Sequence, residues 1–162
     1  LFNDDISNWD TRNVTNMRGM FQNATEFNQP LGQWNTSNVK NMRCMFCNAW
    51  CFNQDLTEWN VSKVTTMHAM FLCATSFNFP LKQWDVKAVT DMGSMFKDAC
   101  AFDQDLRHWN VLNVVNMTYL FAGTKKAEKK VCRMERKLWK RQTSKCKMQY
   151  FGLCENTANE KI

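Results

Sequence analysis

The chain has 162 residues and a net charge of +6 that is unevenly distributed along it. Residues 1–124 carry 9 Lys and Arg against 11 Asp and Glu, a net charge of −2, whereas residues 125–162 carry 12 against 4, a net charge of +8. This length suits one ordinary domain, and no apolar run approaches the roughly 18 residues of a membrane-spanning helix. Because the chain starts at Leu1 without a Met or a signal peptide, we expect the natural protein to continue upstream.

A sequence repeat organises the first three-quarters of the chain. Its clearest markers return in unbroken register at Phe2, Phe27, Phe52, Phe77 and Phe102 and at Trp9, Trp34, Trp59, Trp84 and Trp109. We number the positions of each repeat from its first Phe. A fixed period of this length indicates an array in which each repeat is one structural unit. We therefore predict two parts, five repeats in residues 1–124 and a separate tail in residues 125–162.

Each repeat is predicted to hold a strand followed by a short helix. In the third repeat, Leu56, Trp59 and Val61 have the L-x-x-W-x-V spacing of a strand with one inward apolar side. From Val64 onward the apolar residues step by three, three, one and three, which is helical spacing. Position 12, just before this stretch, often carries an Asn that is a candidate helix cap: Asn13, Asn38 and Asn113.

One repeat cannot fold alone, because its eight or nine apolar side chains cannot offset the entropy lost in ordering its backbone. Neighbouring repeats must therefore stack, with Phe on Phe and Trp on Trp. We predict an α/β repeat fold, a leucine-rich-repeat-like parallel solenoid of about five 25-residue rungs. Each rung would be a strand plus a short helix, and all five Trp side chains would be buried in one column.

The repeat motif resembles a known family. The run L-x-x-W-x-V is similar to the L-x-x-L-x-L segment of leucine-rich repeats. The longer motif FNQDL-x-x-W-[DN]-V-S-x-V-T-x-M-x-x-MF-x-x-A resembles that of the BspA-like leucine-rich repeat surface proteins, a group also called DUF285 in Mycoplasma lipoproteins, and it covers about Phe2 to Phe121. This resemblance implies a protein at the cell surface or outside the cell that acts in adhesion and interaction.

The sulfur-containing residues suggest two metal sites, and for both the structural interpretation is favoured. Cys44, Cys47 and Cys51 form C-x-x-C-x-x-x-C, which lacks a fourth ligand for zinc or an iron–sulfur cluster. Met at positions 16 and 19 has an M-x-x-M spacing that can hold copper(I), but its recurrence beside a Phe favours core packing. We predict no metal and no cofactor. Cys47 and Cys73, on adjacent repeats, are the pair best placed for a disulfide.

Position 9 is always Asp or Asn. Three interpretations are open for this row, namely a ladder of side-chain hydrogen bonds, a local Asx turn in each repeat, or a cation site. Only Asp10 and Asp85 are charged, and they are not on neighbouring repeats. The ladder or the Asx turn is therefore favoured over calcium.

The tail is predicted to begin with a basic amphipathic helix. Ala127, Val131, Met134 and Leu138 step by four, three and four, which makes one apolar face among Lys and Arg residues. We expect this helix to cap the open edge of the last repeat. The alternative is a basic segment that binds nucleic acid or an anionic membrane.

The repeats indicate a binding module, not an enzyme. His68 and His108 lie in different repeats, with no catalytic arrangement of Ser, Cys or carboxylate beside either, and no nucleotide-binding Gly motif is present. Positions 7, 9 and 11 alternate with the inward residues of the predicted strand and should form a flat polar face. We expect this face to bind protein or glycan on another cell or matrix, with no small-molecule substrate; the alternative is a structural spacer in a larger surface protein. The candidate binding residues are Asn8, Asp10, Gln33, Asn35, Glu58, Asn60, Ser62, Gln83, Asp85, Lys87, His108 and Asn110.

Overall fold

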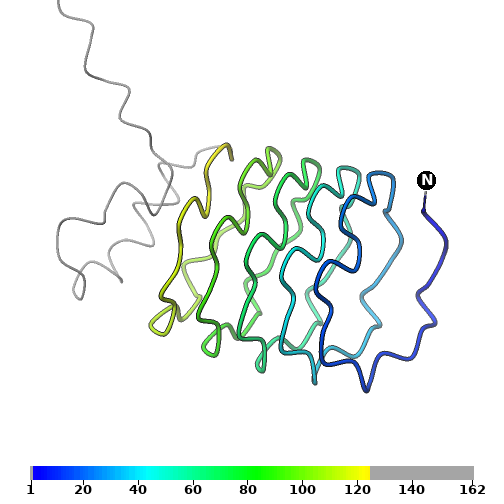
Figure 1. The fold of residues 1–162 in the computed structure, drawn as a ribbon, viewed down its shortest axis with the longest axis horizontal. Helices are drawn as coiled ribbons and strands as arrows, with labels where there is room; N and C mark the ends of the chain where they lie inside the picture. Colours follow the sequence, from blue (N-terminus) through cyan, green and yellow to red (C-terminus); the bar gives the residue numbers. More distant parts are fainter. Residues whose placement is uncertain (1, 125–162) are drawn as a thin grey trace, which may run out of the picture.

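The computed structural model of this chain describes residues 2–124. They form five successive turns of backbone, which we call rungs 1 to 5 (2–26, 27–51, 52–76, 77–101 and 102–124). The rungs lie side by side in sequence order, from rung 1 in blue to rung 5 in yellow (Figure 1). Each rung is one repeat.

The predicted strand-plus-helix rung is wrong. Residues 2–124 contain no α-helix and no β-strand, which overturns the predicted α/β solenoid. The only pairing of strand type in this range is a set of isolated parallel bridges at position 15, which join Asn16 to Asn41, Asn41 to Thr66, Thr66 to Asp91, and Asp91 to Asn116. One bridging residue per rung does not make a sheet. Within the same range there is also no helix long and apolar enough to cross a membrane.

The backbone of each rung is a succession of β-turns. In rung 3 the N–H groups of Trp59, Val64 and Met70 each donate to the carbonyl oxygen three residues earlier, at 2.9–3.1 Å. The first two of these turns occupy the residues that were predicted as a strand, so the backbone there is not extended. The L-x-x-W-x-V spacing still buries its apolar residues, because each turn brings its first and fourth residues to the same side.

The helical spacing after position 13 also has a different cause. Ala69 and Cys73 have φ values of +54° and +56°, whereas every residue of a helix needs a φ near −63°. All five rungs have left-handed backbone at positions 18 and 22: Gly19, Cys44, Ala69, Ser94 and Tyr119, and Asn23, Asn48, Cys73, Asp98 and Gly123. Most of these residues are not Gly, and left-handed backbone is unfavourable for them in isolation. The contacts between rungs must therefore maintain it.

Backbone hydrogen bonds between rungs take the place of those within a helix. The N–H groups at positions 16, 18, 20 and 22 donate to carbonyl oxygens of the following rung, at 2.7–3.1 Å across the four interfaces. At position 14 the direction is reversed, and Thr65 N–H donates to the Lys40 carbonyl of the preceding rung at 2.9 Å. In an α-helix these groups would be satisfied within the element. Here a rung needs its neighbours to satisfy its backbone.

Short polar side chains close the tight turns. Oδ1 of Asp55 and of Asn60 accepts the N–H two residues further on, at 2.9 and 3.1 Å, and Oδ1 of Asn41 does the same at 2.9 Å. These Asx turns recur at positions 4, 9 and 15 of the repeat. Asp and Asn at these positions therefore fix local backbone geometry. At position 4 of rungs 2 and 4 the residue is Pro instead, and at position 15 of rung 3 it is Thr66.

Side chains also link each rung to the one before it. Asn38 and Asn113, predicted to cap helices, instead donate from Nδ2 to a carbonyl oxygen of the preceding rung, at 2.9 and 2.8 Å. The Trp residues of rungs 2 to 5 also donate hydrogen bonds to the preceding rung. Their indole N–H groups donate to the position 5 carbonyl oxygen of the preceding rung at 2.9–3.1 Å.

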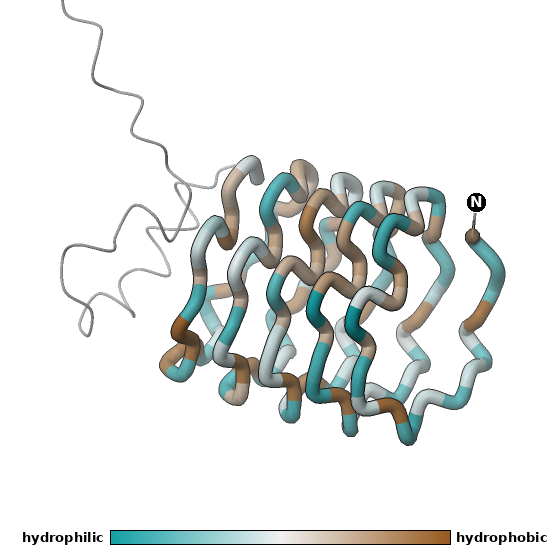
Figure 2. The backbone as a smooth tube through the Cα atoms, viewed as in Figure 1, coloured by the Kyte–Doolittle hydropathy of each residue, from teal (hydrophilic) through white to brown (hydrophobic). Residues whose placement is uncertain are grey.

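The core consists of stacked aromatic rings and Met side chains. Phe residues at positions 1 and 20 form two columns, with ring centroids 5.4–6.1 Å apart along each column. The two columns contact each other at 4.0–4.2 Å. Figure 2 shows hydrophobic residues returning at the same places on successive rungs. Of the nine Met residues at positions 16 and 19, only Met20 is not buried, which confirms their packing role.

Rung 1 leaves one side of the core uncovered among residues 2–124. Trp34, Trp59, Trp84 and Trp109 are 1–3% exposed, whereas Trp9 is 54% exposed. The prediction of a buried Trp column is confirmed for these four residues and is wrong for Trp9. The physical reason is that the preceding rung supplies both the cover and the carbonyl acceptor, and the described part of the chain has no rung before Trp9.

The predicted basic helix falls outside the described residues. Val131, Met134 and Leu138, which were expected to cover the last repeat, lie in residues 125–162. The cap, the alternative basic binding segment and the boundary at residue 124 stay predictions.

We predict that replacing Trp59 by Ala destabilises the protein far more than replacing Trp9. Trp59 is 3% exposed and its indole N–H donates to the Leu31 carbonyl at 2.9 Å, so its loss leaves a cavity that costs about 3–5 kcal/mol. Trp9→Ala should cost about a third of that value or less, because half of this side chain is already in water. Denaturant midpoints of the two variants check the difference. Equal losses would mean that burial by the preceding rung does not control stability.

A second prediction is that low pH weakens the Asx turn formed by Asp105. Hydrogen bonds from the Arg107 side chain and backbone lower the pKa of Asp105 from 3.8 to about 2. A carboxyl with a lowered folded pKa stabilises the fold above its unfolded pKa, and this contribution is lost as the pH falls through the folded value. The melting temperature should therefore fall between about pH 4 and pH 2. Asp105→Asn keeps the Asx acceptor without an ionisable group and should make the fall shallower; an unchanged slope would contradict this explanation.

Candidate functional site

The twelve predicted binding residues, which we call the polar face, lie at the surface. Eleven of them are exposed, and Ser62 is half-buried. They were predicted from strand alternation, but no strand is present in this part of the chain. They point outward because the residues between them, such as Trp59 and Val61, are buried in the core. The apolar pattern was therefore sufficient to place the polar face, although the backbone conformation was wrong.

Position 9 forms local Asx turns. The Oδ1 atoms of Asp10, Asn35, Asn60, Asp85 and Asn110 accept the N–H of position 11 at 3.0–3.3 Å. In rungs 2 and 3 the hydroxyl of the following Ser also donates to this oxygen, at 2.6 and 2.7 Å. The Asx turn is thus the correct one of the three interpretations of this row. One oxygen of each position 9 side chain is already engaged with its own rung.

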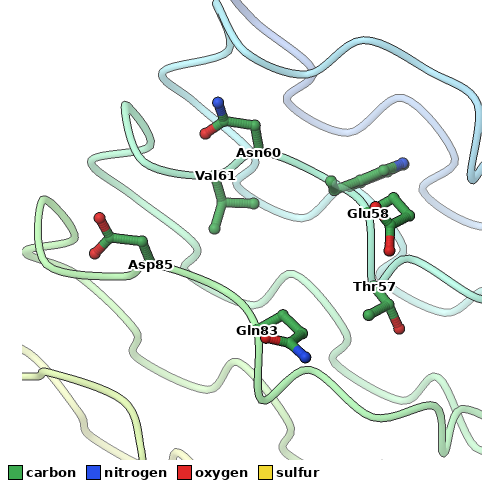
Figure 3. Close-up of a pocket in the computed structure, with 7 residues that line it drawn as sticks. Thr57, Glu58, Asn60, Val61, Gln83 and Asp85 are labelled. Carbon is green, nitrogen blue, oxygen red and sulfur yellow. The ribbon is translucent and has the colours of Figure 1, made fainter.

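A groove of about 360 Å³ crosses the polar face between rungs 3 and 4. It is lined by Thr57, Glu58, Trp59, Asn60 and Val61 of rung 3 and by Gln83 and Asp85 of rung 4. Figure 3 shows the two residues of rung 4 on one segment and the residues of rung 3 on the neighbouring one. Since Trp59 and Val61 are buried, the accessible wall of the groove is mainly polar.

Charges on the polar face are mainly negative. It contains three carboxylates, those of Asp10, Glu58 and Asp85, and one ammonium group, that of Lys87. Lys87 Nζ lies 2.9 Å from Asp85 Oδ2, and this hydrogen bond lowers the pKa of Asp85. Asp85 therefore stays ionised at neutral pH beside an exposed cation.

Sequence reasoning missed a second polar row, at position 2. Here Oδ1 of Asn3, Asn28, Asn53 and Asn78 accepts the N–H of position 2 in the following rung, at 2.8–3.0 Å. A Gln at position 3 adds a donor to the same Asn in three rungs. This is the amide ladder that was considered for position 9. The recurring F-N-Q triplet is the only sequence signal that points to it.

His68 lies in a half-buried polar cluster. Its Nδ1 is 3.4 Å from Asp91 Oδ1, and the same oxygen accepts the Nδ2–H of Asn116 at 2.8 Å and the N–H of Gly93 at 2.9 Å. A Cβ atom on Gly93 would lie 2.6 Å from Asn116 Nδ2 and 2.9 Å from His68 Nδ1, so a larger residue here would displace these two side chains from the cluster. The cluster joins rungs 3, 4 and 5.

The described cysteines are free thiols, and the predicted bridge between Cys47 and Cys73 is absent. Cys47 is buried, and burial is the main reason its pKa rises to about 11, with smaller contributions from Cys44 and Cys73. Cys51, the third member of the cysteine motif, is exposed. Residues 2–124 contain no group of three or more His, Cys, Asp or Glu side chains that could hold a metal ion.

We predict a fixed order of thiol modification. Cys51 and Cys100 are exposed and should react first with iodoacetamide, whereas Cys47 should react last because it is buried and stays protonated at neutral pH. Peptide mass spectrometry over a time course of labelling measures this order. Early labelling of Cys47 in the folded protein would mean that rungs 2 and 3 open readily.

Comparison with known proteins places the chain in a family. Neither the curated proteins nor the solved structures contain a match to it. A family model does match, over residues 1–72 and again over residues 50–159. These two segments span nearly the whole chain, which therefore belongs to the family described as "Mycoplasma protein of unknown function, DUF285".

Proposed function

We propose that this chain is a non-catalytic interaction module that binds glycans through the polar face. The observation that supports this proposal is the groove between rungs 3 and 4, whose accessible walls are side chains with hydrogen-bonding groups. Glu58 and Asp85 provide acceptors, the Asn60 amide nitrogen provides donors because its oxygen already holds the Asx turn, and the Gln83 amide provides both. Because a sugar hydroxyl group both donates and accepts hydrogen bonds, it needs partners of both kinds.

The charge of the polar face limits the classes of ligand that it can bind. Of the three carboxylates, Asp10 is paired with Arg12 and Asp85 with Lys87, which leaves Glu58 as the carboxylate of the polar face without an ion pair in residues 2–124. A face with so little net charge favours neutral ligands. Leu112 is the only large apolar residue exposed at positions 7, 9 and 11 of the described rungs. A hydrophobic protein surface therefore has little to bind here, which is why a neutral glycan is the better candidate.

Repetition suggests many weak contacts. Positions 7 and 9 carry Gln33 and Asn35 on rung 2, and chemically similar pairs on rungs 3 and 4. Successive rungs thus offer similar groups at a regular spacing, and linked weak sites gain affinity through effective concentration. Such binding suits adhesion at the cell surface, which is the location that we propose.

The second candidate function is a structural spacer. The unbroken series of hydrogen bonds between rungs favours it, because it would make a stiff rod without any ligand. The binding experiment below separates the two functions.

The test compares the full chain with a triple variant, Gln33→Ala, Glu58→Ala and Gln83→Ala. All three changes fall at position 7, so the Asx turns of position 9 remain intact, and the variant should fold normally. We expect the wild type to bind neutral oligosaccharides on a glycan array and the variant to lose at least about tenfold in affinity, which is the effect of about 1.4 kcal/mol.

The matched control is Gln22→Ala with Glu26→Ala, two exposed residues of the same types outside the polar face. It should bind like the wild type. Unchanged binding by the triple variant would overturn the glycan site, and failure of the wild type to bind any glycan would favour the spacer.

A further inference from the structure

Positive charge collects on one side of rungs 1 to 3. Positions 11 to 18 of these rungs contain five Lys and Arg residues and no Asp or Glu. The carboxylates of the same three rungs all lie at other positions: Asp4, Asp5, Asp10, Glu26, Asp55 and Glu58. Because equivalent positions align along the stack, this separation in sequence becomes a separation in space.

Four of the five cations form what we call the basic strip: Arg18, Lys40, Arg43 and Lys63. The fifth, Arg12, is excluded because its Nε lies 2.9 Å from Asp10 Oδ1. Within residues 2–124, none of the ion pairs involves a member of the basic strip. Lys63 Nζ does donate a hydrogen bond to Asn38 Oδ1 at 2.8 Å, but this partner is neutral.

The backbone holds the basic strip in register. Arg18 and Arg43 occupy position 17 of neighbouring rungs, and the Arg43 carbonyl accepts the N–H of Gly19 at 2.9 Å. Lys40 N–H donates to the Thr15 carbonyl at 2.8 Å, which aligns position 14 in the same two rungs. The stacked Phe rings of these neighbouring rungs are 5.4–6.0 Å apart, so cations at equivalent positions are also close together. The basic strip therefore runs obliquely from position 17 of rung 1 to position 12 of rung 3.

The strip is accessible and has a defined end. Arg18, Lys40 and Lys63 are exposed, and Arg43 is half-buried. On rung 4, Gly93 takes position 17 and the Asp91 carboxylate appears at position 15, so the positive region stops at rung 3. Like charges at such short spacing repel each other, and a chain of negative charges would remove this repulsion.

We propose that the basic strip binds an acidic polysaccharide, with sulfate or carboxylate groups, along the axis of the stack. Asn16 and Asn41 lie beside these cations; their Oδ1 atoms hold Asx turns, and their Nδ2–H groups can donate to sulfate or sugar oxygens. Arg18 and Arg43 offer planar guanidinium groups that pair with carboxylate or sulfate oxygens.

A nucleic acid fits the strip less well. Binding of single strands depends on aromatic side chains on which bases stack. The large aromatic residues exposed in the described rungs are Phe2, Trp9, Trp50 and Tyr119, at positions 1, 8, 24 and 18. None of them lies between positions 12 and 17, where the cations of the strip are found.

The test uses the full chain with the twelve Lys and Arg residues of 125–162 changed to Gln, so that the basic tail does not contribute. In this background we compare the parent with Arg18→Gln, Lys40→Gln, Arg43→Gln and Lys63→Gln combined. The probe is heparin, and affinity is measured by titration at several salt concentrations. The strip variant should bind at least about tenfold more weakly, and its log affinity should depend less steeply on log salt, because fewer counterions are released when fewer cations bind.

The matched control removes the same charge outside the strip, by Arg12→Gln, Lys82→Gln, Lys97→Gln and Arg107→Gln combined. It should change heparin affinity by less than about threefold, because it affects only the long-range field. Circular dichroism and melting curves show whether each variant is folded. Equal loss in both variants would overturn the basic strip as a site, and so would heparin binding that resists the strip substitutions. Competition by double-stranded DNA as strong as that by heparin at equal charge would overturn the polysaccharide assignment.

Discussion

Hydrogen bonds between the backbones of neighbouring rungs are the constraint on which the rest of this structure depends. At each of the four interfaces, the same alternate N–H groups, at positions 16 to 22, donate to the following rung. A slip of one residue would break all of them and would also separate the Phe columns, whose rings stack at 5.4–6.1 Å. The bonds and the rings therefore require the same register, and this agreement makes a rung without helix or strand stable.

The register also explains how unfavourable backbone is tolerated. Residues such as Tyr119 and Cys44 have positive φ, which costs free energy for any residue that has a Cβ atom. In return, in rungs 1 to 4 the N–H of each left-handed residue donates to the following rung, and the N–H after it closes a turn within its own rung. An isolated repeat would lack the acceptor carbonyl and would relax. Folding of one rung is thus coupled to the presence of another, as in other repeat proteins.

Because the rungs stack in register, residues at the same outward position of each repeat form a row on the surface. Many polar residues in these rows are already used by the fold: the Asx oxygens at position 9 hold turns, and the amides at position 2 join rungs. The groups left for ligands include the side chains at position 7, the remaining acceptor capacity of the Asp85 carboxylate, and the cations at positions 12, 14 and 17 of rungs 1 to 3, and these differ from one repeat to another. This variation separates an acidic groove at Glu58 and Asp85 from a basic strip on rungs 1 to 3. One scaffold thus presents two surfaces of opposite charge.

The sequence by itself determined the repeat length, the buried positions and the outward positions. Phe, Trp and Met recur with a strict period, and apolar side chains enter the core whatever backbone carries them. This is why the residues of the polar face were correctly placed at the surface, and why the Met pairs were correctly assigned to packing. The repeated motif was also sufficient to identify the DUF285 family.

Only the tertiary structure decided the backbone of each rung. The spacings of Leu56, Trp59 and Val61, and of Val64, Met67 and Met70, are satisfied equally by a strand and a helix or by successive β-turns. What selects turns is the hydrogen bond partner of each N–H group, and for Met67, Ala69 and Phe71 that partner is a carbonyl oxygen of the next rung, almost a full repeat away along the chain. The spacing of apolar residues within one repeat contains no information about a carbonyl acceptor in the next repeat. For the same reason, the exposure of Trp9, the groove between rungs 3 and 4 and the course of the basic strip became visible only once the rungs were stacked.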